Sequence, residues 1–331
     1  MLINALFCFS LAFVVAFLIS PLVFAFCKKL KASQTILHYV EAHKSKEGTP
    51  TMGGFIFIIG TISASFFAFN LDFTFALLTI ISMLAYATLG FLDDFIKIKT
   101  KQNLGLRAYQ KLIGQVGISL IIGFFIYNYV GSTIATPFTS LSLDLGIFII
   151  PFIVLFFVAL VNSVNLLDGL DGLCSGVSQA FLLGFVLLLS LAVTSLTGTL
   201  LTETQNLIFI CFCLMGALFA FQIFNGYPAS IFMGDTGSLA IGGFLSAVTA
   251  FSGLELYVLI LGLPFVLTAL SDLIQVIYFK KTKKRVFLMA PLHHHFEKKG
   301  INENKIVIVY IVITVMLGIL TYLLASYFGG L

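Results

Sequence analysis

The chain has 331 residues, of which 60% are hydrophobic and 10% are charged, and its formal net charge is +4. An ordinary soluble domain is about half apolar and about a quarter charged, so this composition excludes that class of protein. The five cysteines lie in or beside apolar segments without the spacing of metal ligands. We therefore expect them to be packing residues and predict no disulfide framework.

Ten apolar segments follow one another along the chain, and most approach the roughly 20 residues that a membrane-spanning helix needs. Their apolar residues are continuous and do not alternate, which favours helices over the strands of a membrane barrel. We predict an all-α, polytopic membrane protein that forms a single domain over residues 1–331. The predicted spans are 4–26, 52–69, 73–92, 112–130, 146–164, 176–195, 207–224, 236–252, 255–279 and 305–328.

The basic residues predict how these spans cross the membrane. All 18 lysines and arginines follow spans one, three and nine, and the remaining connections on the opposite side contain none. The positive-inside rule then places the basic connections in the cytoplasm and both termini outside. This face suits anionic lipid headgroups and anionic substrates, so membrane lipid is an expected partner and nucleic acid is not. Membrane orientation by itself explains most of these lysines.

The third span closes with two adjacent acids, Asp93 and Asp94. Acids near a helix C-terminus oppose the helix dipole, and Lys97 and Lys99 offset this effect. Two neighbouring carboxylates suit a divalent cation, or a general base whose pKa is adjusted by its neighbour. A polar end to the helix, without further function, is the alternative.

The connection 162–172 carries two asparagines, two aspartates and two glycines between spans five and six. Asp168 and Asp171 are three residues apart, so a helical turn would place them on one face. The glycines permit close approach of the backbone to a ligand. A capped tight turn is the alternative, but such a turn rarely needs four acidic or amide side chains. The pattern favours a functional loop.

Asp235 begins span eight within the sequence Met-Gly-Asp-Thr-Gly-Ser. Such a residue is either a functional acid or the N-cap of the following helix. Upstream, Asn225 adds an amide and Phe232 an aromatic ring that could stack on a base, although a core phenylalanine is the commoner case.

Three consecutive histidines, His293, His294 and His295, follow span nine. Successive residues of a helix point about 100° apart, so at most two can face one site. Imidazoles offer phosphate binding, metal ligation or proton transfer near neutral pH, and a solvated basic loop is the alternative. Before span two, Lys46 and Thr51 lie in a glycine-rich segment that has the composition of a phosphate cradle but lacks the P-loop motif.

Span nine contains Pro264 and is about 25 residues long, which exceeds the thickness of the hydrocarbon core. An interior proline removes a helical hydrogen bond and kinks the chain. We expect a bent helix that opens a groove from the bilayer to the polar site, with simple tilting as the alternative.

In this order and with this spacing, the motifs resemble those of the phospho-N-acetylmuramoyl-pentapeptide-transferases, and the resemblance runs from about Lys46 to Glu303. It implies transfer of phospho-N-acetylmuramoyl-pentapeptide from UDP-MurNAc-pentapeptide to undecaprenyl phosphate with Mg²⁺, giving UMP and lipid I. It also implies ten helices in the bacterial cytoplasmic (inner) membrane, a homodimer, and a bent ninth helix beside a lipid groove.

The resemblance also implies roles for individual residues. Asp93 matches the base on the lipid phosphate, and Asp235 matches the principal Mg²⁺ ligand, with Asn165 near the metal. The expected catalytic residues are Asp93, Asp94, Asp235, His293 and His294. The expected substrate-binding residues are Lys46, Thr51, Lys111, Asn165, Asp168, Asp171, Asn225, Phe232 and His295.

Two other functions fit part of this pattern. A polyprenyl-phosphate N-acetylhexosamine-1-phosphate transferase shares the acidic motifs, but the Gly-Thr-Pro-Thr-Met-Gly-Gly and Pro-Leu-His-His-His-Phe-Glu segments favour the muramoyl-pentapeptide branch. A secondary transporter would place ionisable residues deep within its spans, whereas these motif acids lie at span ends.

Overall fold

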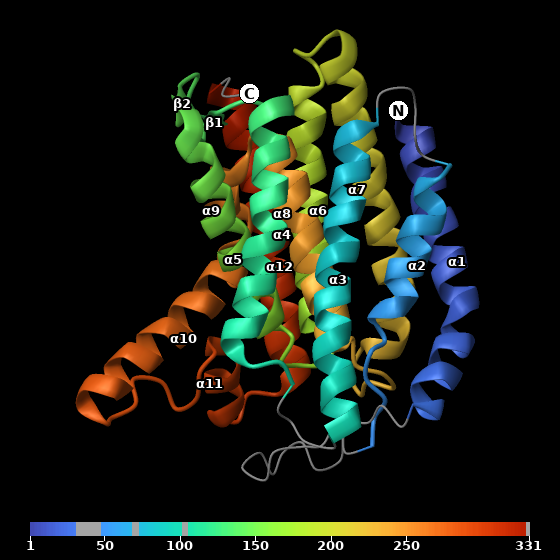
Figure 1. Ribbon diagram of the computed structural model, residues 1–331, viewed down its shortest axis with the longest axis vertical. Helices are drawn as coiled ribbons and strands as arrows, with labels where there is room; N and C mark the ends of the chain where they lie inside the picture. Colours follow the sequence, from blue (N-terminus) through green and yellow to red (C-terminus); the bar gives the residue numbers. More distant parts are fainter. Residues whose placement is uncertain (31–47, 68–72, 101–104, 329–331) are drawn as a thin grey trace.

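The structure is a computed structural model that describes residues 1–30, 48–67, 73–100 and 105–328. Its helices form one bundle, and α10 leans away from the others (Figure 1). The helices are α1 (Leu2–Lys29), α2 (Gly54–Ser65), α3 (Thr74–Thr100), α4 (Ala108–Tyr129), α5 (Ile149–Leu167), α6 (Leu173–Ala192), α7 (Gly198–Asn225), α8 (Gly234–Phe251), α9 (Val258–Leu261), α10 (Leu263–Thr282), α11 (Leu292–Lys298) and α12 (Glu303–Phe328).

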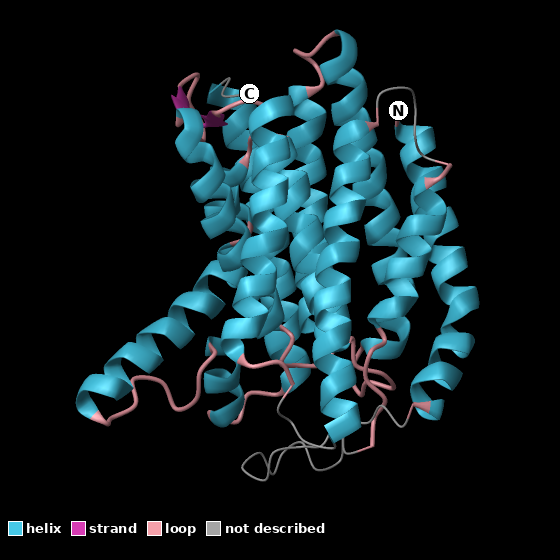
Figure 2. Ribbon diagram, viewed as in Figure 1, coloured by secondary structure: helices cyan, strands magenta, loops and turns pink. Residues whose placement is uncertain are grey.

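The remaining regular structure is small (Figure 2). Two three-residue strands, β1 (Thr133–Ala135) and β2 (Ser142–Asp144), pair antiparallel with Ile134 opposite Leu143. Single 3₁₀ turns, η2 (Gly146–Phe148) and η3 (Glu255–Tyr257), precede α5 and α9. The all-α prediction is therefore confirmed, with one short hairpin added.

Within the described residues, eight helices are long and apolar enough to cross a membrane. They are α1, α3, α4, α5 with η2, α6, α7, α10 and α12. Large apolar side chains such as Leu18, Ile121 and Ile308 are exposed on the outside of the bundle, where hydrocarbon is a more suitable environment than water. The chain is a multi-pass membrane protein, and the count of ten spans stays a prediction, since α2 has only 12 residues.

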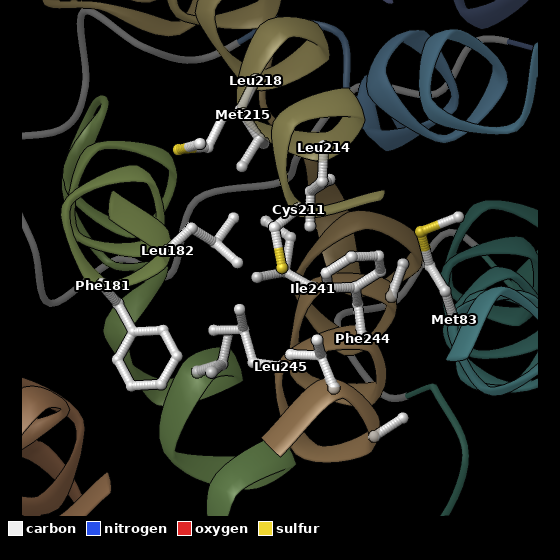
Figure 3. Close-up of a cluster of buried hydrophobic side chains, with 14 of the residues drawn as sticks. Met83, Phe181, Leu182, Cys211, Leu214, Met215, Leu218, Ile241, Phe244 and Leu245 are labelled. Carbon is white, nitrogen blue, oxygen red and sulfur yellow. The ribbon is translucent and has the colours of Figure 1, made fainter. Parts of the chain in front are cut away.

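The core is built around α8, in which every residue from Thr236 to Phe251 is buried. Figure 3 shows Ile241, Phe244 and Leu245 of this helix packed among side chains of α3, α6 and α7. Because protein surrounds α8, it tolerates glycine and serine that a lipid-facing helix would not favour. All five cysteines lie in the described residues and are buried free thiols, which confirms their predicted role in packing.

The predicted ninth span, 255–279, is not one continuous helix. The chain passes through η3 and α9, breaks at Gly262 and continues as α10, with Pro264 in the first turn. Proline lacks an N–H and clashes with the preceding turn, so it is favoured where a helix begins. All buried residues of α10 lie in its first half, and its second half leans out of the bundle (Figure 1). The predicted bend is confirmed, and its form is a break.

The bundle has two distinct ends. The start of α1 and the end of α12 are both at the end of the bundle that carries the β1–β2 hairpin (Figure 1). The opposite end carries the C-terminal end of α3, the N-terminal end of α8 and helix α11. Which of the two ends faces the cytoplasm stays a prediction.

Candidate active site

Three carboxylates meet where α3 ends and α8 begins. Asp93, Asp94 and Asp235 each offer an oxygen within 4.8 Å of the others. The two helices approach so closely that a Cβ on Gly90 would lie 2.1 Å from the carbonyl oxygen of Asp235. Only glycine permits this contact. The predicted grouping of these acids is thus brought about by a glycine one turn before Asp93.

Asp94 is bound to the backbone at the start of α8. Its carboxylate accepts hydrogen bonds from the N–H of Asp235 at 3.2 Å, the N–H of Thr236 at 2.8 Å and the hydroxyl of Thr236 at 2.7 Å. These are groups that an N-cap normally satisfies. The N-cap residue of α8 is Met233 and Asp235 lies within the first turn, so the alternative in which Asp235 caps its own helix is wrong. Asp94 of α3 performs that role.

Asp93 and Asp235 face two lysines. The Nζ atom of Lys97 lies 2.6 Å from Asp93 Oδ2 and 2.8 Å from Asp235 Oδ2. The Nζ atom of Lys111 lies 2.8 Å from the same Asp235 oxygen. Lys97 was expected only to offset the helix dipole. Its i+4 spacing from Asp93 was the signal that could have placed it in the site.

Asn165 joins the same cluster from the end of α5. Its Nδ2 donates to Asp235 Oδ1 and to Ser238 Oγ, each at 2.7 Å. The expected proximity of Asn165 to Asp235 is therefore seen. In the following loop, burial, together with the negative charges of Asp235 and Asp94, raises the pKa of Asp168 to about 8. Positive charge arriving near Asp168 would favour its ionised form.

A second group of predicted residues lies around the 226–232 segment, which joins α7 to α8. Asp171 Oδ2 accepts the N–H of Ala229 at 3.0 Å, and Asn225 Nδ2 donates to the carbonyl of Ile231 at 3.0 Å. The backbone N–H of Phe232 donates to the Pro50 carbonyl at 2.9 Å. Both side-chain contacts fix the shape of this segment.

The Phe232 side chain is half-buried, which argues against a pure core role. Thr51 lies between the two groups, since a Cβ on Gly234 would be 2.8 Å from Thr51 Oγ1 and 2.6 Å from Asp94 Oδ2. Lys46 lies outside the described residues.

Two of the three histidines pack against the loop that carries Asp168. A Cβ on Gly169 would lie 2.4 Å from His293 Nε2 and 2.8 Å from His294 Nε2. His294 Nδ1 is also 2.8 Å from Glu297 Oε2. His295 instead accepts the N–H of Leu288 at 3.1 Å. The expectation that at most two histidines face one site is confirmed.

His293 is fully buried, and within the described residues its ring nitrogens have no hydrogen-bond partner. Burial, with a smaller contribution from His294, lowers the pKa of His293 to about 3. In this arrangement the ring is therefore neutral near pH 7, and an arriving phosphate anion would favour its protonated form.

The donor set suits a hard divalent cation. Such ions prefer carboxylate and amide oxygens, and the acidic cluster supplies carboxylates. Asn165 contacts Asp235 through its Nδ2, so its amide oxygen would face a cation once the amide is turned over. Asp94 is already bound to the start of α8, so Asp93 and Asp235 remain as carboxylates that can exchange their lysine partners for a metal, and the released lysines can then bind phosphate.

Comparisons with known proteins agree with this geometry. Residues 75–253 match the model of glycosyl transferase family 4. A phospho-N-acetylmuramoyl-pentapeptide-transferase of Desulfitobacterium hafniense is 39% identical over 327 residues, covering 97% of both chains. Proteins of the same name from Clostridium novyi and Thermoanaerobacter sp. are 42% and 41% identical, covering 94% of this chain and 94% and 97% of theirs. The chain therefore belongs to the phospho-N-acetylmuramoyl-pentapeptide-transferase family within glycosyl transferase family 4.

Proposed function

We propose that this protein transfers phospho-N-acetylmuramoyl-pentapeptide from UDP-MurNAc-pentapeptide to undecaprenyl phosphate in bacterial peptidoglycan synthesis. An oxygen of the lipid phosphate attacks the phosphorus that carries the sugar. The bond from that phosphorus to the bridging oxygen breaks, and its electron pair leaves with UMP. The product is lipid I. The observation that carries the proposal is the cluster of Asp93 and Asp235 with two lysines at one end of a membrane bundle.

The charges of the cluster support this chemistry. Two anionic phosphates must be held together, and Lys97 and Lys111 reduce their repulsion. Asp93 lies beside Lys97 and is the proposed base, taking the proton of the lipid phosphate when one is present. Asp235 and Asn165 would hold Mg²⁺, which supplies positive charge to the diphosphate as UMP leaves.

Asp94 acts at one remove from the reacting atoms. Its bonds to the backbone of Asp235 and Thr236 fix the start of α8 and so orient Asp235. This assigns to Asp94 a positioning role within the expected catalytic group.

The remaining predicted residues are assigned to the two halves of the donor. The proposed nucleoside side is formed by the 162–172 and 226–232 segments, which contact each other through Asp171. It comprises Asp168, Asp171, Asn225 and Phe232. The proposed pyrophosphate side comprises Thr51, Lys111, His293 and His294. Lys46 and His295 stay proposals from sequence. We further propose that the site faces the cytoplasm, that the membrane is the bacterial inner membrane, and that the protein is a homodimer.

The direct test is UMP release by the detergent-purified protein with undecaprenyl phosphate and Mg²⁺. We expect release with UDP-MurNAc-pentapeptide and none with UDP-N-acetylglucosamine. Release only with the hexosamine donor would keep the reaction and assign the donor specificity to the sister branch. Absence of release with either donor, in folded protein, would overturn the proposal.

A further inference from the structure

The 168–172 loop between α5 and α6 is held by several distant parts of the chain. Helix α11 covers Gly169 with two histidine rings. From α7, Gln222 Nε2 donates to the carbonyl of Gly172 at 3.4 Å, and Gly172 itself adopts φ +76° at the start of α6. The loop carries Asp168 and Asp171, so its position decides where both carboxylates lie.

A further contact comes from the first residue of α12. Glu303 Oε1 accepts the backbone N–H of Asp171 at 2.7 Å, across a sequence separation of 132 residues. The Asp171 side chain in turn accepts the N–H of Ala229 at 3.0 Å. Asp171 therefore links α12, through its backbone, to the 226–232 segment, through its carboxylate.

The 226–232 segment ends at Phe232, whose position is fixed from the other side. The N–H of Phe232 donates to the Pro50 carbonyl at 2.9 Å, and the N–H of Gly53 donates to the Phe232 carbonyl at 2.8 Å. A shift at Ala229 would therefore strain the segment between two anchored points. Holding Asp171 in place is a way to hold Ala229 in place.

We propose that Glu303 is a positioning residue for the nucleotide half of the donor. Its carboxylate holds Asp171, and Asp171 holds the segment that presents Phe232. This inference rests on the proposed function, because that function places the nucleoside beside these residues. The Asp93–Asp235 cluster is built from α3, α4, α5 and α8 and not from α12, so we expect the loss of Glu303 to leave it in place.

A purely stabilising role is the competing explanation. Glu303 lies in the first turn of α12, where a negative charge interacts favourably with the helix dipole. Two conservative variants separate these roles. Glu303→Gln keeps an acceptor oxygen at the same reach and loses the charge. Glu303→Asp keeps the charge and shortens the reach by one methylene.

The experiment compares Glu303→Ala, Glu303→Gln and Glu303→Asp with the wild-type protein, all full-length in detergent. Asn304→Ala, at the exposed next position, is the matched control. KM for UDP-MurNAc-pentapeptide, KM for undecaprenyl phosphate and kcat are measured for each. Hydrogen exchange is followed by mass spectrometry in peptides that cover residues 168–173 and 226–232.

For Glu303→Ala we expect a rise in donor KM of about tenfold, the scale for losing one hydrogen bond. Lipid KM and kcat should stay within about threefold of wild type. Exchange should be faster in both peptides. Glu303→Asp should behave like Glu303→Ala, whereas Glu303→Gln and the control should resemble wild type, since the hydrogen bond matters and the charge does not.

Unchanged exchange in Glu303→Ala and Glu303→Asp would overturn the contact, and faster exchange with unchanged donor KM would overturn the positioning role. A wild-type-like Glu303→Asp beside an impaired Glu303→Gln would assign Glu303 to the helix dipole. If wild-type protein releases no UMP while the exchange pattern appears as expected, the proposed function fails, and nucleotide positioning fails with it, although the contact stands.

Discussion

Buried carboxylates meet α3 at both of its ends, and they are bound in opposite ways. At the start of α3, Glu203 of α7 accepts the N–H groups of Thr74 and Phe75, each at 2.9 Å. At the other end, Asp93 and the neighbouring Asp235 contact lysine ammonium groups, and Asp93 also accepts the N–H of Leu106 at 2.8 Å. A carboxylate bound to helix N–H groups is tied to a rigid backbone. A carboxylate bound to lysine can exchange its partner for a metal, which frees the lysine to bind an anionic substrate.

Asp94 shows why the distinction matters within a single motif. It is adjacent to Asp93 in sequence, yet its bonds to α8 are of the same kind as those of Glu203 to α3. The comparison therefore separates two neighbouring aspartates by their main partners. Asp93 lies 2.6 Å from Lys97, whereas Asp94 lies 3.9 Å from that lysine and is held chiefly by the start of α8.

The largest expected effect on activity comes from changing a lysine-bound carboxylate, Asp93 or Asp235. Asp235→Asn should lower the rate of UMP release by on the order of 10³-fold, because one preorganised charge is lost from the reacting centre. The melting temperature in detergent should change little, since the amide keeps the shape of the side chain. Near-normal turnover in this variant would remove Asp235 from the reactive cluster and with it the basis of the comparison.

The close contact of α3 with α8, which brings Asp93 and Asp94 beside Asp235, can be disrupted at Gly90. A methyl group there would lie 2.1 Å from the Asp235 carbonyl oxygen, so Gly90→Ala should cost about 3 kcal/mol of folding stability and most of the activity. Gly117→Ala is the matched control, because a Cβ on Gly117 meets nothing within 4 Å. Thermal unfolding of both variants would test this, and equal stability of the two would contradict the close approach of α3 and α8.

The fold was predictable from sequence because apolar runs are local signals. Prediction from local patterns failed where a charged side chain is hydrogen-bonded by a partner far away in the sequence. The seventh span was predicted to begin at residue 207, whereas α7 begins at Gly198 and includes the buried Glu203. Glu203 is accommodated because it binds amides that lie 129 residues earlier in the chain. No sequence pattern within one segment predicts the hydrogen bonds between Glu203 and the start of α3.

The candidate site divides in the same way. The acids were identified because carboxylates are rare in an apolar chain, and their grouping followed from lying at span ends. The cap formed by Asp94 and the contact of Lys97 with Asp235 depend instead on how α3 crosses α8. In the sequence, Gly90 lies between Leu89 and Phe91 within an apolar run, and only the structure shows it facing Asp235.

The capping class can be tested at Glu203. Glu203→Ala leaves the N–H groups of Thr74 and Phe75 without this acceptor, which should lower the free energy of unfolding by about 2 kcal/mol. Glu203→Gln keeps one acceptor oxygen and should lose less. Donor KM, lipid KM and kcat at a temperature where both variants are folded should match wild type. A large fall in kcat with unchanged stability would show that Glu203 contributes to catalysis and is not simply a helix-capping carboxylate.

The smallest expected effect concerns a third kind of buried group, His293, which within the described residues has no hydrogen-bond partner on either ring nitrogen. Burial lowers its pKa to about 3, below the ordinary value of about 6.5 in an unfolded chain. The unfolded state therefore binds a proton first as the pH falls. Stability from this group is present above pH 6.5 and is lost progressively toward pH 3.

Between pH 7.5 and pH 5.5, the difference between the folded and unfolded pKa values of His293 lowers the free energy of unfolding by roughly 1 kcal/mol. Wild-type protein should lose that much more stability over this interval than His293→Gln, which has no proton to bind. Thermal unfolding of both proteins at the two pH values measures the difference, and the pair at pH 7.5 is the reference because imidazole is mostly neutral there in both states. An equal loss of stability in both proteins would mean that His293 has a hydrogen-bond partner or solvent in the folded protein. His293 would then resemble the carboxylates of the reactive cluster, which can exchange their partners.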